Sequence, residues 1–364
     1  MAFSGRPKIN FAFRSFFNFF TEYALLNKLS EGEFVLLSDC GYFPTRMLRR
    51  IYTLFFLVIG SMFLSAAHAQ QPTQFSQFQL NQLYFNPAAA GADGVTRLQV
   101  IHRTQYAGYQ GTFDAGGSPS TQMFSASTAI KNVGVGFTAF NDKIGAWSNQ
   151  SFQLAVAYRF ALSNGNLAVG ASAGLFRSAI DYNILRARDD GDLLIGTGVV
   201  GEIHPDVNLG IRYETAAYYL GISANHLLNA KYKLGSDLAT NPLIPVYYLN
   251  GGVNLEIGYL FEVQPFALVK SDFSSPIALE GGVMGTYNKR YWAGISYRNQ
   301  DALIFMGGIN LMANQSLRLS GAYDLVIGAP TLKTPTSYEV MLSYQMPAPK
   351  FGKKTIVRTP RFRF

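Results

Sequence analysis

Residues 151–160 read SFQLAVAYRF, and their apolar side chains fall at every second position. One face of this segment carries Phe152, Leu154, Val156, Tyr158 and Phe160. The other face carries Ser151, Gln153, Ala155 and Arg159. Strict alternation over this length is typical of a β-strand with one apolar and one polar face.

The same alternation recurs along the chain and predicts an all-β protein. It is clear in 253–259, 317–325 and 338–344, where large apolar residues oppose Glu256, Arg318 and Glu339. We predict fourteen strands, at 95–106, 119–130, 133–143, 150–161, 166–177, 207–213, 216–227, 246–257, 261–270, 276–286, 290–298, 301–310, 316–326 and 336–346. A twelve-strand interpretation follows if two weak strands are merged or dropped.

Loop lengths distinguish a membrane barrel from a soluble sandwich. Every second connection is short: 131–132, 162–165, 214–215, 258–260, 287–289 and 311–315. The connections between them include the long stretches 107–118, 178–206, 228–245 and 327–335. Outer-membrane barrels combine tight periplasmic turns with long surface loops. The sequence therefore predicts a transmembrane antiparallel up-and-down β-barrel over 95–346, with both termini in the periplasm.

Composition agrees with strands that face lipid. Charged residues make up 14% of the chain, well below the roughly 25% of soluble domains. No run of about 20 apolar residues, the length that a membrane-spanning helix needs, follows residue 70. These observations exclude a helical membrane protein.

The first 69 residues resemble a targeting segment and not part of the fold. Two arginines, Arg49 and Arg50, precede an apolar run and the small residues Ala67 and Ala69, which is the pattern of a cleavable signal peptide over 47–69. Residues 1–46 do not fit that pattern, so we interpret Met47 as the true start and 1–46 as a mis-annotated extension. In a competing interpretation, 11–20 form an additional amphipathic segment. Cleavage would remove Cys40, the single cysteine, and so exclude disulfides and thiolate chemistry from the mature chain.

The net charge of +8 does not indicate nucleic-acid binding, because the excess is local. Residues 70–346 hold 17 Lys and Arg against 18 Asp and Glu, a net charge of −1. The tail 347–364 is basic, and its candidate partner-binding residues are Lys353, Lys354, Arg358 and Arg361. Such a tail is either simply solvated or binds an acidic partner or lipid headgroups.

Residues 70–94 precede the first strand and show neither the two-residue period of a strand nor the 3.6-residue period of a helix. They are too rich in Phe, Tyr and Leu for a flexible linker, so we expect a periplasmic segment that packs on the barrel mouth or inside it. Its candidate partner-binding residues are Phe75, Phe78, Tyr84, Asn86 and Pro87.

Polar residues on the inward faces of the strands are the remaining candidates. They are Arg97, Arg103, Gln105, Glu256, Arg318, Asp324 and Glu339. They could line a channel, hydrogen-bond a plug, or pair with one another as inward ions.

No catalytic or cofactor motif stands out. Three histidines, His102, His204 and His226, lie far apart in the mature sequence, and no nucleophile elbow or phosphate-binding glycine loop is present. The acidic run 189–192 lacks the spacing of a calcium loop. We therefore expect neither enzymatic activity nor a metal or cofactor.

Several motifs resemble those of the PorP/SprF membrane proteins of the type IX secretion system. The most specific is 74–91, QFSQFQLNQLYFNPAAAG. HRTQY at 102–106, NVGVG at 132–136, SYEVMLSY at 337–344 and TPRF at 359–362 are similar to later motifs of that family. Tyr106 and Ala89 depart from it, where Trp and Tyr are common.

This resemblance implies an outer-membrane barrel that supports protein export and, in gliding Bacteroidota, the surface display of a motility adhesin. It implies periplasmic or lipoprotein partners within the secretion system, and for some members one specific secreted substrate. The alternatives are a porin or nutrient channel and, third, an outer-membrane lipid hydrolase with a Ser-His pair.

Overall fold

The computed structural model describes residues 73–109, 117–185, 197–234, 240–312, 315–327 and 336–349. Most of these residues are in β-strands. The predicted signal peptide, the extension before it and the four candidate partner-binding residues of the tail lie outside these ranges. Within the described ranges, no helix has both the length and the apolar character needed to cross a membrane.

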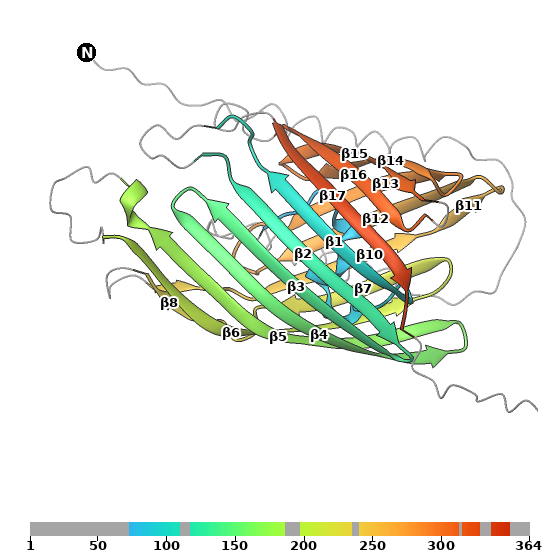
Figure 1. Cartoon of the computed structure of the whole chain (residues 1–364), viewed down its shortest axis with the longest axis horizontal. Helices are drawn as coiled ribbons and strands as arrows, with labels where there is room; N and C mark the ends of the chain where they lie inside the picture. The colour runs from blue at the N-terminus through green and yellow to red at the C-terminus, as the bar shows by residue number, and fades with distance from the viewer. Residues whose placement is uncertain are drawn as a thin grey trace, which may run out of the picture. The chain divides into compact units, whose positions relative to one another are not determined.

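Fifteen strands form one antiparallel sheet that closes on itself (Figure 1). In chain order they are β1 (Val95–Thr104), β2 (Ser120–Ile130), β3 (Val133–Ile144), β4 (Trp147–Leu162), β5 (Gly165–Asp181), β6 (Val199–Glu214), β7 (Tyr218–Asn225), β10 (Val246–Val253), β11 (Leu255–Ile257), β12 (Phe261–Ser271), β13 (Ala278–Tyr287), β14 (Tyr291–Arg298), β15 (Ala302–Leu311), β16 (Leu317–Val326) and β17 (Thr336–Pro347). Both β10 and β11 pair with β12, so together they make one wall strand. The barrel therefore has fourteen strands, as predicted.

Closure between the first and last strands defines two rims. Val95 pairs with Pro347, so β1 begins where β17 ends. We call this end the turn rim, because all six strand connections there span at most five residues. The opposite end, the loop rim, carries the longest connections, although β3–β4 and β14–β15 are joined there by short turns. The predicted alternation is confirmed.

Two predicted loops contain strand residues. The connection predicted at 178–206 is shorter in the structure, because β5 runs on to Asp181 and β6 starts at Val199. Pro205 obscured this in the sequence. Pro205 is tolerated because residues 199–208 of β6 pair with β5 alone. The other edge of β6 does not pair with β7 over these residues, so a proline there removes no hydrogen bond between the two strands. The stretch 228–245 contains the hairpin of β8 (Lys231–Lys233) and β9 (Thr240–Pro242).

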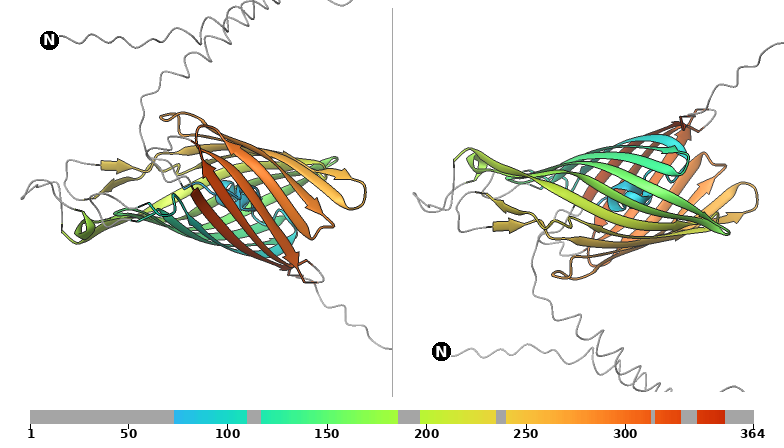
Figure 2. Two further views of the ribbon diagram at one scale, coloured as in Figure 1. Left: turned by 90° about the horizontal axis from the view of Figure 1, so that it is seen from above. Right: turned by 90° about the horizontal axis from the view of Figure 1, so that it is seen from below.

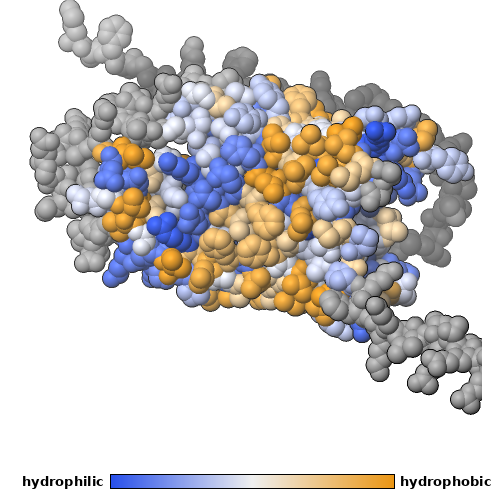
Figure 3. Space-filling model, viewed as in Figure 1, coloured by the Kyte–Doolittle hydropathy of each residue, from blue (hydrophilic) through white to orange (hydrophobic). Residues whose placement is uncertain are grey.

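The outer surface of the wall is apolar. Leu154 is 63% exposed, whereas its neighbour Gln153 is 7% exposed. Exposed apolar side chains alternate with buried polar or small ones along β4. Exposed apolar side chains form a broad zone over the middle of the strands (Figure 3). A soluble protein does not expose an apolar area of this extent. The pattern is that of a barrel whose outer face contacts lipid.

Candidate functional site in the barrel lumen

Residues 73–94 lie inside the barrel and are called the plug (Figures 1 and 2). They form three short turns, η2 (Phe78–Leu80), α3 (Gln82–Phe85) and η3 (Pro87–Ala89). The last begins at Asn86, whose side-chain oxygen accepts a hydrogen bond from the Ala88 N–H at 2.9 Å. Proline at the first position of η3 needs no donor there. Consecutive short turns explain why the segment shows neither strand nor helix period.

Aromatic side chains fill one half of the lumen. Phe75, Phe78 and Phe85 of the plug are all buried. Phe78 packs edge-on against Phe266 of β12 with ring centroids 5.3 Å apart, and Phe85 against Tyr248 of β10 at the same distance. Edge-to-face pairs of this kind add to the free energy of apolar burial. The plug is thus part of the hydrophobic core.

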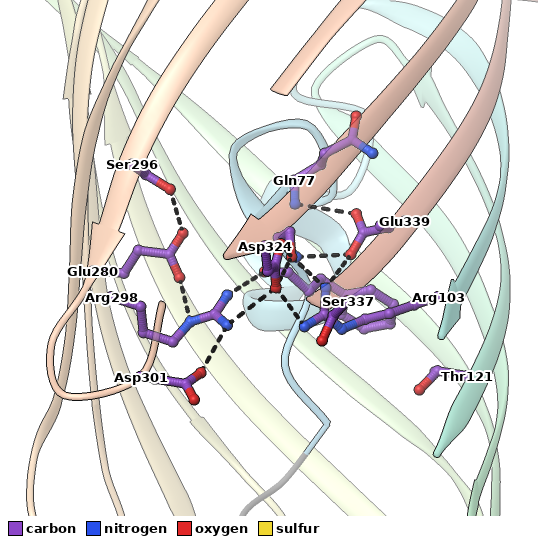
Figure 4. Close-up of polar contacts among 12 residues, drawn as sticks. Gln77, Arg103, Thr121, Glu280, Ser296, Arg298, Asp301, Asp324, Ser337 and Glu339 are labelled. Atoms are coloured by element: carbon purple, nitrogen blue, oxygen red, sulfur yellow. Dashed lines mark hydrogen bonds and ion pairs between the residues drawn. The ribbon is translucent and has the colours of Figure 1, made fainter. Parts of the chain in front are cut away.

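An ionic cluster joins the plug to β1, β16 and β17 (Figure 4). Arg103 Nη2 donates to Asp324 Oδ2 at 2.7 Å, and its Nη1 donates to the Ser76 hydroxyl. Ser76 Oγ donates to Asp324 at 2.6 Å, while the Ser76 and Gln77 N–H groups donate to Glu339 at 2.7 and 3.1 Å. Each of these side chains is nearly fully buried. Mutual pairing satisfies charges that would be costly to bury alone.

A second arginine extends this cluster. Arg298 of β14 donates to Glu280 at 2.8 Å and to Asp301 at 3.2 Å, and its Nη1 lies 3.7 Å from Asp324. Its Nη2 also donates to the Phe75 carbonyl at 3.4 Å. Two arginines, from strands on either side of β16, therefore contact the start of the plug (Figure 4).

The end of the plug rests on glycines of the opposite wall. A Cβ at Gly210 of β6 would lie 2.1 Å from Asn86 Oδ1, and one at Gly170 of β5 would lie 2.4 Å from Ala88 N. At Gly134 of β3 the distance to the Ala90 carbonyl would be 1.9 Å. No side chain fits at these positions, so the wall is shaped for the Asn-Pro-Ala-Ala-Ala backbone. The Asn86 amide also donates to the Ile211 carbonyl at 3.0 Å.

The lumenal candidates separate into two groups. Arg103, Asp324 and Glu339 meet in the ionic cluster. Arg97 pairs with Asp93 at 3.1 Å, and Arg318 donates to Asn310 at 2.8 Å, both toward the turn rim. Gln105 follows the end of β1 in the loop-rim connection. Glu256 is exposed in β11 beside the turn rim, where it lies opposite Glu262 of β12 and on the strand face that alternates with the outward Leu255 and Ile257.

The partner-binding candidates of the plug also need correction. Phe75, Phe78, Asn86 and Pro87 are buried in the lumen, and Tyr84 is half-buried with its ring 4.9 Å from that of Phe75. They contact the barrel wall, where a docked partner would not reach them. Sequence reasoning missed Ser76 and Arg298, although Arg298 falls on the inward face of its strand by simple alternation.

The histidines do not form a catalytic group. His102 is exposed on the outer face of β1. His204, predicted in a loop, lies in β6 with its ring nitrogen 3.2 Å from Glu202, and His226 lies 2.9 Å from Asp206. Among the described residues, no three His, Cys, Asp or Glu side chains are grouped so as to hold a metal ion.

A family model described as the type IX secretion system membrane protein PorP/SprF matches residues 67–344, which include the plug and nearly all of the barrel. The chain belongs to the PorP/SprF family. It is an outer-membrane β-barrel, and its family is one of secretion-system membrane proteins.

Three solved structures are similar to this PorP/SprF barrel. The toluene transporter TbuX of Ralstonia pickettii is 12% identical with a TM-score of 0.46, over 73% of this chain and 93% of that one. The toluene transporter TodX of P. putida is 13% identical with a TM-score of 0.43, over 73% and 93%. A FadL homologue of Pseudomonas aeruginosa is 10% identical with a TM-score of 0.42, over 70% and 90%. A search of curated proteins gave no match.

Proposed function

We propose that this PorP/SprF protein is a non-enzymatic component of the type IX secretion system that supports the export or surface attachment of secreted proteins, including a gliding adhesin. The family supports the secretion role. The observation that carries the proposal is the plug, whose buried aromatic and ionic contacts fill the lumen with the protein's own chain. A barrel filled in this way serves as a membrane-anchored scaffold for partners.

The test is a deletion strain complemented with the wild-type gene or an empty vector. We expect type IX cargo, measured by mass spectrometry of the medium and of the cell surface, to fall several-fold in the deletion strain and to recover on complementation. Barrel assembly is checked by heat-modifiable migration on gels. Unchanged cargo on the surface and in the medium would contradict the proposal.

The alternative is a porin or nutrient channel, which requires an open lumen. Reconstitution in planar bilayers separates the two, because a plugged barrel should show no steady conductance. Stable open-channel currents from the wild-type protein would favour the porin.

We further propose that the turn rim faces the periplasm, since tight turns gather on that side of outer-membrane barrels. Pro347 lies at this rim, so the basic tail starts where periplasmic or lipoprotein partners would bind. Neutralising Lys353, Lys354, Arg358 and Arg361 should weaken partner capture more at low than at high salt, because exposed charges are screened. Equal loss in pull-downs at both salt concentrations would contradict an electrostatic role.

A further inference from the structure

The plug runs through the lumen from one rim to the other. Thr73 and Gln74 line a cavity of about 20 Å³ together with Lys270, Glu280 and Arg298, which lie at the loop-rim ends of β12, β13 and β14. Ser76 and Gln77 contact Glu339, three residues from the loop-rim start of β17. The start of the described chain is therefore beside the loop rim.

The other end of the plug is at the turn rim. Arg159, near the turn-rim end of β4, donates to the Ala90 carbonyl. Gly91 adopts φ +60° directly against the Thr128 carbonyl of β2, and Val95 then begins β1 opposite Pro347. The described chain therefore starts beside one rim, crosses the lumen before its first strand, and ends at the other rim, whereas we expected both termini on one side.

We propose that the amino end of the mature protein lies at the loop rim, on the cell surface, while the basic carboxyl tail starts on the periplasmic side. The inference rests on the proposed orientation of the barrel and on cleavage after Ala69. Cleavage there leaves three residues before Thr73, which reach about 10 Å at most. That is too short for the amino end to return through the barrel. A secreted partner at the surface would therefore meet the tip of the plug, Thr73 and Gln74, beside the surface loops.

The mature sequence lacks cysteine, so single cysteines report position directly. In a Cys40→Ser background, Thr73→Cys is compared with Asp93→Cys, its matched control at the other end of the plug. Phe273→Cys marks the loop rim and Lys289→Cys the turn rim; both positions are exposed. Intact cells are treated with a membrane-impermeant maleimide, before and after the outer membrane is opened.

We expect Thr73→Cys and Phe273→Cys to be labelled on intact cells, and the other two only after opening. Thr73→Cys labelled only after opening, with Phe273→Cys labelled before, would overturn the proposal. If Lys289→Cys is labelled on intact cells and Phe273→Cys only after opening, the proposed orientation of the barrel is wrong. In that case the path of the plug from the loop rim to the turn rim is supported if Thr73→Cys is labelled under the same conditions as Phe273→Cys, and overturned if it is not.

A second measurement locates the plug by its distance to the wall instead of by labelling from outside the cell. A short thiol crosslinker that enters the detergent-solubilised barrel should join Ser76→Cys to Glu339→Cys within one chain and give a compact band on gels, whereas Ser76→Cys with Ser127→Cys, which lies on the lumenal face of β2 near the turn rim, should give none. A crosslink to Ser127→Cys alone would place the plug the other way round and overturn the threaded path.

A different observation, on the outer wall, carries a second inference. Five polar side chains lie in register across β1 to β5 and are called the polar row: His102, Gln122, Asn141, Gln150 and Arg177. Gln150 donates to Asn141 at 3.1 Å, and Asn141 donates to Gln122 at 2.9 Å. A hydrophilic strip crosses this face in Figure 3 and borders the apolar zone.

The polar row marks an abrupt boundary between apolar and polar side chains on the outer face of the wall. One step toward the turn rim, the outward positions are Val100, Phe124, Ala139, Phe152 and Leu175. One step toward the loop rim, they are Thr104, Ser120, Lys143, Ser148 and Ala179. Neither the polar row nor this next set contains an Asp or Glu, whereas Arg177, Lys143 and His102 offer positive charge or donors.

We propose that the polar row and Lys143 bind the phosphate groups of phosphorylated lipid in the leaflet at the loop rim. The apolar side chains below would contact the acyl chains of the same lipid. Arg and Lys side chains are favourable phosphate ligands, and the neighbouring amides supply further donors.

The probe is bisphosphorylated lipid A, titrated onto the purified barrel in mild detergent, with native mass spectrometry reading the bound fraction. Lys143→Gln/Arg177→Gln should weaken binding by about tenfold, which corresponds to about 1.4 kcal/mol. Lys289→Gln/Arg290→Gln, at the exposed turn rim, should leave it unchanged. Equal binding by wild type and the first double variant would overturn the proposal, as would full competition by millimolar inorganic phosphate, which indicates a free-anion site.

Discussion

Arg103 is the central cation of the lumen, 1% exposed and bound to Asp324, Glu339 and Ser76. Arg103→Met would leave two buried carboxylates without their main partner. Removing one member of a buried ion pair costs about 3–5 kcal/mol. We expect a loss of unfolding free energy in this range, measured by urea titration with gel mobility as the readout. Arg290→Met, at an exposed turn, should change it little; equal effects would contradict the role of the cluster.

Gly210 is a position where one methyl group is enough to disturb the plug. In Gly210→Ala the new Cβ would meet Asn86 Oδ1 at 2.1 Å, so the Asn86 turn must move away from the wall. We expect increased protease cleavage within residues 73–94, mapped by mass spectrometry. Gly281→Ala is the matched control, because its nearest neighbour would be 3.9 Å away. Unchanged cleavage in Gly210→Ala would contradict a fitted wall.

At the scale of elements, the plug occupies the lumen through which a channel would conduct. Deleting residues 74–90 removes its three aromatic anchors and the groups that pair with Glu339. We expect the shortened barrel to insert and to conduct ions in planar bilayers, where the wild type does not. Phe75→Ser/Phe78→Ser should give intermittent currents, because the ionic contacts of the plug remain. A silent deletion variant that is correctly folded would show that other parts of the chain close the lumen.

At the scale of the whole molecule, the outward alternation defines the depth of the barrel in the membrane. Leu154 faces outward near the middle of β4, and Leu162 faces outward at its turn-rim end. An arginine on the lipid face costs about 2–4 kcal/mol at the midplane and about 0–1 kcal/mol near the interface. Leu154→Arg should therefore reduce assembly into lipid vesicles much more than Leu162→Arg. Similar yields would place the membrane elsewhere along the strands.

Alternation along 151–160 and its counterparts was enough to predict fourteen strands and the apolar outer face, because strand side chains alternate wherever a sheet separates two environments. The family was predicted from the resemblance of the motif at 74–91 and of the later motifs. Only the tertiary structure decided where the plug lies. Its short turns have no period, and its burial depends on glycines of distant strands, such as Gly170 and Gly210. The pairing of Arg103 with Asp324 joins residues 221 positions apart, and only closure of the barrel brings such residues together. The path of the plug through the lumen follows from that closure.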